Sequence, residues 1–167
     1  WMEDEKLREE TCSERLTIEE EFEMQASWEK DIDKVTFIVL DASTGEMVGD
    51  VNLFLYEEDE PYEAEINVMI ADRSRRRGGL GTEAVRLIMA YGWHRFGARK
   101  YVAKIGADNS ASLSMFRKLG FEEEKYSEAF RQHTLVLRPA APARPHIHEG
   151  EEGLGTALSE MSLSKPQ

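Results

Sequence analysis

The chain has 167 residues and a single cysteine, Cys12. Disulfide bonds and cysteine-based metal sites need more than one cysteine, so neither can form within the chain. A lone thiol suits a reducing compartment, and we expect a cytoplasmic or nuclear location. Cys12 has no obvious base beside it, so an ordinary thiol is favoured over an acyl carrier.

The chain also lacks a long hydrophobic run. No apolar segment is long enough to cross a bilayer, no leader resembles a signal peptide, and the start at Trp1 leads us to expect a truncated N-terminus. With 33 acidic and 21 basic residues the net charge is -12, which repels nucleic acid and anionic lipid. We therefore expect a soluble protein whose partners include neither nucleic acid nor a membrane.

Apolar periodicity is weak after Pro139, where Pro, Ala, Gly, Glu and Ser dominate. Residues 139–167 are therefore predicted to form a disordered acidic tail. In this tail His146 and His148 have only Glu149 near them, so adventitious contact with metals is favoured over a site, and we assign no metal. The remaining residues, 1–138, have room for one domain with a hydrophobic core.

The patterns in that domain predict helices first and then a sheet. A capping box from Thr17 to Glu20 opens a helix, and residues 1–34 are assigned to N-terminal helices. Strands are predicted at 35–40, 48–56, 63–70, 101–105 and 131–137, with helices at 80–96 and after Asn109. This order predicts an α/β fold with a mixed, mainly antiparallel sheet flanked by helices.

The segment from Arg75 to Thr82 reads Arg-Arg-Arg-Gly-Gly-Leu-Gly-Thr and lies between a predicted strand and a predicted helix. Glycines let several N–H groups point at one anion, the helix adds its positive N-terminal end, and the arginines supply mobile charge. We interpret the segment as a pyrophosphate pocket, with a solvated basic turn as the plain alternative. A Rossmann dinucleotide loop is disfavoured, because residues 71–77 separate the strand from the first glycine.

The order of hairpin, strand, Arg/Gly loop, helix, strand and Asn-headed helix over residues 35–137 resembles the GNAT acetyltransferase superfamily. The two signatures of that superfamily are matched at Arg76, Gly79, Gly81, Asn109, Ser112 and the run from Lys118 to Phe121. The resemblance implies the GNAT acyl-CoA N-acyltransferase fold. It also implies that residues 35–138 form a catalytic core that binds acetyl-CoA as cosubstrate.

By the same resemblance, the loop backbone would hold the CoA pyrophosphate, while the strand end at Met69 and Ile70 and the side chain of Asn109 would bond the pantetheine arm. The implied cofactor-binding residues are Met69, Ile70, Arg76, Arg77, Gly78, Gly79, Gly81, Thr82, Asn109 and Phe116. Many GNAT enzymes have a tyrosine at the position of Phe116, where it protonates the leaving thiolate. Phenylalanine cannot donate this proton, so water would have to substitute.

Glu65 is the candidate catalytic base. In the predicted strand, Ile66, Val68 and Ile70 share one face, and Glu65, Asn67 and Met69 share the other, which can meet a ligand. The carboxylate would take a proton from an amine directly or through water. A purely structural pairing of Glu65 with a neighbouring strand stays open as the alternative.

Three phrases, Phe37–Asp41, Met47–Leu55 and Gly79–Val85, are similar to family members that acetylate the N-termini of α- and β-tubulin. The resemblance thus implies an N-acetyltransferase that acts on a protein N-terminal α-amine, with tubulin as substrate. Such members carry a further first strand and helix upstream, so we expect an unpaired sheet edge here. A catalytically weak or inactive CoA-binding or tubulin-interaction module remains the alternative, favoured by Phe116 and by those absent elements.

Overall fold

A computed structural model describes residues 1–11, 13–56 and 63–139 of the chain. The helices are α1 (Glu5–Thr11), α2 (Ile18–Trp28), the short 3-10 helix η1 (Arg73–Arg75), α3 (Leu80–Phe96) and α4 (Ser110–Lys118). The strands are β1 (Lys34–Leu40), β2 (Met47–Tyr56), β3 (Glu63–Ile70), β4 (Lys100–Gly106), β5 (Glu122–Ser127) and β6 (Gln132–Leu137). The predictions for Cys12 and for the tail beyond Pro139 lie outside the described residues, and the division at residues 34 and 138 stays a prediction.

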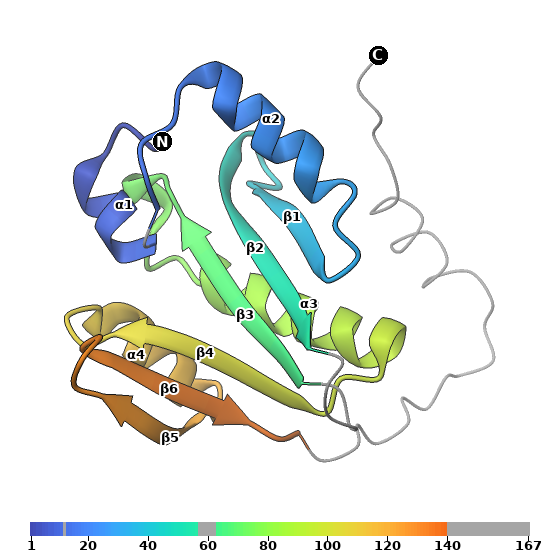
Figure 1. Cartoon of the computed structure of the whole chain (residues 1–167), viewed down its shortest axis with the longest axis vertical. Helices are drawn as coiled ribbons and strands as arrows, with labels where there is room; N and C mark the ends of the chain where they lie inside the picture. The colour runs from blue at the N-terminus through green and yellow to red at the C-terminus, as the bar shows by residue number, and fades with distance from the viewer. Residues whose placement is uncertain (12, 57–62, 140–167) are drawn as a thin grey trace.

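The strands form one six-stranded sheet in the order β1-β2-β3-β4-β6-β5. The pair β3–β4 is parallel, and the other pairs are antiparallel. Because a parallel connection needs a crossover, α3 carries the chain from the end of β3 back to the start of β4 (Figure 1). The predicted mixed, mainly antiparallel sheet is confirmed.

Helices cover the two faces of this sheet. On one face α3 packs on β2 and β3, and α4 packs on β4 (Figure 1). The core there includes the buried Leu53, Ile66 and Ile88, and the Tyr101 hydroxyl donates to the Met89 carbonyl oxygen at 2.6 Å. Burial raises the pKa of that hydroxyl to about 12, so it stays a donor at every physiological pH.

The opposite face of the sheet, which we call the α2 face, carries the side chains at the alternate positions of each strand. Lys34 Nζ lies 3.6 Å from the centre of the Trp28 ring of α2 and 5.1 Å from that of Phe54. Glu65 lies on the same face, since it is the register partner of Phe54. The predicted separation of Glu65, Asn67 and Met69 from Ile66, Val68 and Ile70 follows from this register.

Three features of the fold do not follow from the apolar pattern of the sequence. Leu87, which shares the apolar spacing of α3, is 55% exposed, because Ala84, Val85, Ile88 and Gly92 form the buried stripe of α3. The apolar positions of α2 are also exposed, and α2 has no buried residue. Strand β5 was not predicted, because its sequence EEEKYS has neither apolar alternation nor buried positions.

Within the described ranges, no helix is both long and apolar enough to cross a membrane.

Candidate active site

The loop between β3 and α3 is shaped as an anion-binding site. Arg77 and Gly79 both have left-handed backbone conformations, with φ values of 65° and 96°. No described residue accepts a hydrogen bond from the backbone N–H groups of Arg77 to Thr82, which lie where α3 begins. Successive free N–H groups at a helix N-terminus attract phosphate oxygens, as the sequence predicts for this segment.

Gly81 is required by close packing rather than by backbone conformation. A Cβ atom at this position would lie 3.2 Å from Met115 Sδ and 3.7 Å from Ile70 Cγ1. The first turn of α3 is therefore wedged between the end of β3 and α4. Gly79, in contrast, has open space around it, and its positive φ is what favours glycine there.

Strands β3 and β4 separate beside this loop. They pair at Glu63, Ala64 and Glu65 with Lys100, Tyr101 and Val102, and no later residues of the two strands are in register. The edge of β3 from Ile66 to Ile70 that faces β4 therefore offers backbone N–H and C=O groups to a ligand. An extended chain with amide groups, such as the pantetheine arm of CoA, suits an edge of this kind. Met69 and Ile70 lie at its far end.

Asn109 and Phe116 occupy different environments on α4. Asn109 caps the helix, and its Oδ1 accepts from the Ser112 backbone N–H at 3.1 Å. Because Asn109 follows directly after β4, it stands at the wide end of the gap between the strands. Phe116 is 3% exposed and packs edge-on against Phe121, with 5.0 Å between ring centres. Its ring thus belongs to the hydrophobic core, as well as lying at the position matched to the family's tyrosine.

Glu65 is buried and holds an ion pair. Lys104 Nζ lies 2.6 Å from Glu65 Oε2, and the Tyr56 hydroxyl donates to the same oxygen at 3.1 Å. Through the hydrogen bond and charge of this carboxylate, the pKa of Lys104 is raised. Burial and the nearby carboxylate likewise raise the pKa of Tyr56. Both contacts are of the kind expected from the structural alternative for Glu65.

Comparisons with known proteins decide the family. The sequence pattern of the family described as acetyltransferase (GNAT) domain matches residues 1–122. The chain belongs to the GNAT acetyltransferase family. Among its relatives, the mouse alpha/beta-tubulin-N-acetyltransferase 9 is 49% identical over 159 residues, which are 89% of this chain and 66% of that protein. The N-acetyltransferase 9-like protein of Caenorhabditis briggsae is 48% identical, over 82% of this chain and 74% of that protein.

Solved GNAT structures share the fold. A spermidine N-acetyltransferase from Vibrio cholerae, in complex with CoA and spermine, aligns with a TM-score of 0.71 at 18% identity and covers 82% of this chain and 85% of that chain. A GNAT acetyltransferase from Bacillus anthracis aligns with a TM-score of 0.69 at 14% identity and covers 83% of this chain and 84% of that chain. The predicted GNAT fold and the predicted acyltransferase family are thereby confirmed.

In this GNAT domain, the arginines near the loop are mostly held by other groups. Arg75 Nη1 lies 2.8 Å from Asp41 Oδ2, and Arg76 Nε donates to the Ile70 carbonyl oxygen at 2.7 Å. Arg77 is exposed, and no described residue forms an ion pair with it. The expectation of mobile charge therefore fits Arg77 better than its two predecessors.

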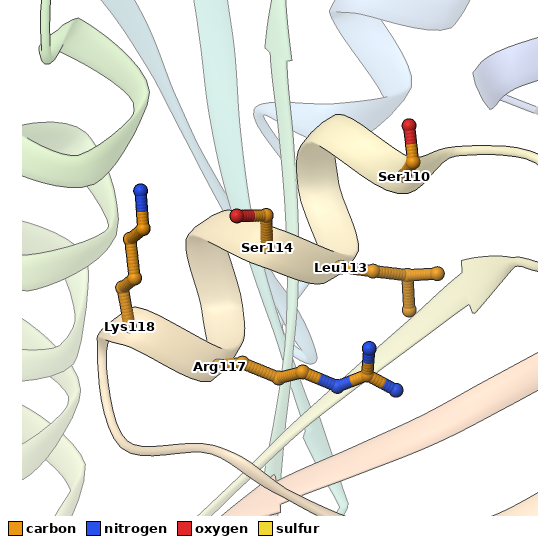
Figure 2. A pocket seen from close by; sticks show the side chains of 5 residues that line it. All are labelled: Ser110, Leu113, Ser114, Arg117 and Lys118. Atoms are coloured by element: carbon orange, nitrogen blue, oxygen red, sulfur yellow. The ribbon is translucent and has the colours of Figure 1, made fainter.

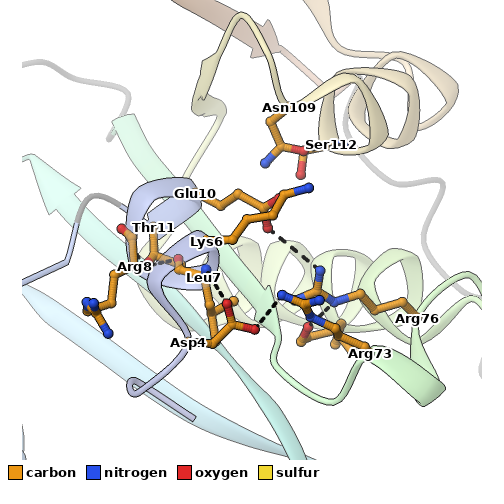
Figure 3. A network of polar contacts seen from close by, with 11 residues as sticks. Asp4, Lys6, Leu7, Arg8, Glu10, Thr11, Arg73, Arg76, Asn109 and Ser112 are labelled. Atoms are coloured by element: carbon orange, nitrogen blue, oxygen red, sulfur yellow. Dashed lines mark hydrogen bonds and ion pairs between the residues drawn. The ribbon is translucent and has the colours of Figure 1, made fainter. Parts of the chain in front are cut away.

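Helix α1 and Asp4, the residue before it, supply carboxylates to the arginines of the same loop. Arg73 Nη2 lies 2.6 Å from Asp4 Oδ2, and Arg76 Nη1 lies 3.7 Å from Glu10 Oε2, while Leu7 of α1 is buried (Figure 3). Asn109 lies on the far side of Glu10 in the same view. No local sequence pattern indicates these contacts, because the paired residues are more than sixty positions apart.

A shallow cavity of about 430 Å³ lies elsewhere, on α4, lined by Ser110, Leu113, Ser114, Arg117 and Lys118 (Figure 2). Arg117 and Leu113 point to one side of α4, and Ser110, Ser114 and Lys118 to the other. Arg117 Nη2 is also paired with Glu123 Oε2 at 3.0 Å. None of the predicted site residues lines this cavity. The described residues contain no group of three or more potential metal ligands.

Proposed function

We propose that this chain transfers the acetyl group of acetyl-CoA to the α-amine at the N-terminus of a protein, with tubulin as the substrate. The observation that carries the cofactor assignment is the run of free backbone N–H groups from Arg77 to Thr82, beside strands that separate after Glu65. An anion site and an open strand edge next to each other suit the pyrophosphate and the pantetheine arm of one ligand.

The choice of tubulin rests on relatives. Proteins named alpha/beta-tubulin-N-acetyltransferase 9 in mouse and human share 49% and 48% of their aligned residues with this chain. An α-amine also needs less help than lysine, because its pKa of about 7.7–8.0 leaves part of it neutral at pH 7, whereas lysine near 10.4 is almost wholly charged. With tubulin as the substrate, we propose a cytoplasmic location for this chain.

We assign the following roles in this transfer to the site residues. The free backbone N–H groups of Arg77 to Thr82, with the charge of Arg76, would hold the pyrophosphate, and Met69, Ile70 and Asn109 would bond the pantetheine arm. Acetyl-CoA supplies the activated thioester. Because Phe116 has no hydroxyl, the proton for the departing thiolate would come from the attacking amine or from water. The sequence predicts Glu65 as the base, and a Glu65→Gln variant with full turnover at every pH would exclude Glu65 from that role.

A titration of the chain with acetyl-CoA tests the cofactor assignment. Charge reversal at Arg76 or Arg77 is expected to weaken binding at least about tenfold, because a carboxylate would then face the phosphates. Arg77→Glu is the cleaner variant, since Arg76 also bonds the Ile70 carbonyl oxygen. Arg138→Glu, which changes a charge paired with Glu124 on the far strand, is the matched control. Parental affinity in both loop variants would overturn the assignment.

Mass spectrometry of tubulin N-terminal peptides tests the reaction. We expect an acetyl-CoA-dependent gain of one acetyl group on the free α-amine and none on a peptide whose N-terminus is already blocked. If a folded chain binds acetyl-CoA but adds no acetyl group, the alternative of an inactive CoA-binding module holds, as the loss of a hydroxyl at Phe116 would favour.

A further inference from the structure

A second carboxylate, Asp50, lies on the α2 face and is held by a chain of polar side chains. The Thr36 hydroxyl donates to Asn52 Oδ1 at 2.6 Å, and Asn52 Nδ2 donates to Asp50 Oδ1 at 2.9 Å. Among the described residues, none forms a hydrogen bond or an ion pair with the other oxygen, Oδ2. One oxygen of Asp50 is therefore held by Asn52, and the other has no hydrogen-bond or ion-pair partner among the described residues.

The register places Asp50 beside the open part of β3. Asp50 is the register partner of Met69, and Asn52 is that of Asn67, so both face the stretch of β3 that has already left β4. Glu65, in contrast, lies at the last position where β3 and β4 still pair. Strand β3 lies between β2 and β4 in the sheet, so β3 itself separates Asp50 from the gap between β3 and β4. A substrate amine would reach Asp50 over the α2 face of β3, level with Met69.

The two carboxylates also differ in their charged neighbours. Glu65 already neutralises Lys104 at 2.6 Å. Burial raises the pKa of Asp50, and the Asn52 hydrogen bond and the charge of Lys34 oppose that rise. Lys34 is the charged group that acts on Asp50. The two register partners of Asp50, Ile38 and Met69, do not titrate. A carboxylate whose pKa is moved toward the working pH is the better proton acceptor.

We propose that Asp50 binds the α-ammonium group of the substrate and takes one proton from it before acetyl transfer. This inference rests on the proposed function, and it gives Asp50 the role of base that the sequence predicts for Glu65. Oδ2 accepts the proton, and the neutral amine then attacks the thioester carbonyl, so that a C–N bond forms and the C–S bond breaks. The second proton lost by the nitrogen passes to the CoA sulfur directly or through water, and Asp50 returns its proton to solvent. Asn52 and Thr36 are positioning residues for this step.

Acetylation kinetics from pH 7 to pH 9 test this role with Asp50→Asn. At pH 7 we expect kcat/KM to fall about 100-fold, the lower end of what general-base catalysis contributes. The loss should shrink about tenfold by pH 9, because the α-amine is then neutral without help. Asp50→Glu keeps the charge and should keep the parental pH profile, and Glu122→Gln, on exposed β5, controls for loss of a surface carboxylate. A loss that is equal at both pH values would overturn the proposal.

A binding measurement separates this inference from the reaction itself. In the complex with CoA, which cannot transfer acetyl, the parent should bind a peptide with a free α-amine about tenfold more tightly than its N-acetylated form, because only the ammonium pairs with Asp50. Asp50→Asn should lose this preference while unfolding at the parental urea concentration. A variant that keeps the preference would overturn the assignment of Asp50. A parent that shows the preference but no turnover would refute the proposed transfer alone.

Discussion

At the scale of single residues, Asp41 joins the turn after β1 to η1, in the loop between β3 and α3. It is 9% exposed and accepts hydrogen bonds from the Ser43 hydroxyl and from the backbone N–H groups of Ser43 and Thr44. Arg75 lies 2.8 Å from its second oxygen. The hydrogen bonds of Ser43, and then the charge of Arg75, hold the pKa of Asp41 below its usual value.

The lowered pKa of Asp41 makes its contribution to stability depend on pH. Because the folded state has the lower pKa, the contribution is present above the ordinary aspartate value of about 3.9 and is lost as the pH falls through the folded value. We expect Asp41→Asn to be less stable than the parent in urea at pH 7, and the difference to shrink as the pH falls below about 3.9. Asp33→Asn, on an exposed carboxylate before β1, should show no such trend. A difference that persists in acid would contradict this account.

For single residues, the sequence predicts the roles that depend on local backbone conformation. Gly79 and Gly81 could be assigned to the loop in advance, because a sharp turn before a helix needs positive φ and close approach. The partner of Glu65 could not be predicted, since Lys104 reaches it from β4 across the sheet and the strand register is invisible in the sequence. The polar partners of Asp50 could not be predicted either. The alternation of polar and apolar residues along β2 predicts which face of the sheet Asp50 is on, but not which side chains contact it there.

At the scale of elements, α1 acts through charge on the loop between β3 and α3. Glu10 Oε2 lies 3.7 Å from Arg76 Nη1, and Glu10 Oε1 lies 3.9 Å from Lys6 Nζ. A carboxylate therefore lies close to the place where phosphates are proposed to bind. Glu10→Gln should tighten acetyl-CoA binding about two- to threefold at low salt, in line with the small worth of exposed charge pairs. The gain should fade as salt is added, because the interaction is screened. Glu5→Gln, in the first turn of α1, is the control. Weaker binding by Glu10→Gln would show that α1 supports the loop instead.

Elements with strong periodicity were predicted closely, and polar ones were not. The strand expected at 63–70 matches β3, and the expected end at Leu40 is that of β1. The predicted helix at 80–96 has the same bounds as α3, whose end is marked by Gly97 in a left-handed conformation. Strand β5 escaped prediction because its residues pair with β6 through the backbone while their side chains stay in solvent. Its position depends on tertiary pairing alone.

At the scale of the whole molecule, the sheet has one edge at β1. Among the described strands, β1 pairs with β2 alone. Leu40 and Met47, which are register partners at this edge, are 53% and 62% exposed. An exposed apolar edge strand can pair with a second copy of the chain, whereas the net charge of -12 keeps copies apart at low salt.

We therefore expect concentration-dependent self-association through β1 that grows with salt, because salt screens the repulsion between acidic copies. Sedimentation velocity of the chain over a range of concentrations, in low and high salt, measures it. Leu40→Lys should reduce the association, since a charge on an edge strand must lose its hydration when a second strand pairs there. Phe130→Lys, at a site that is 81% exposed in the turn between β5 and β6, removes comparable apolar surface away from β1. Equal association of the two variants, or a parent that stays monomeric in high salt, would show that the β1 edge does not recruit a second strand.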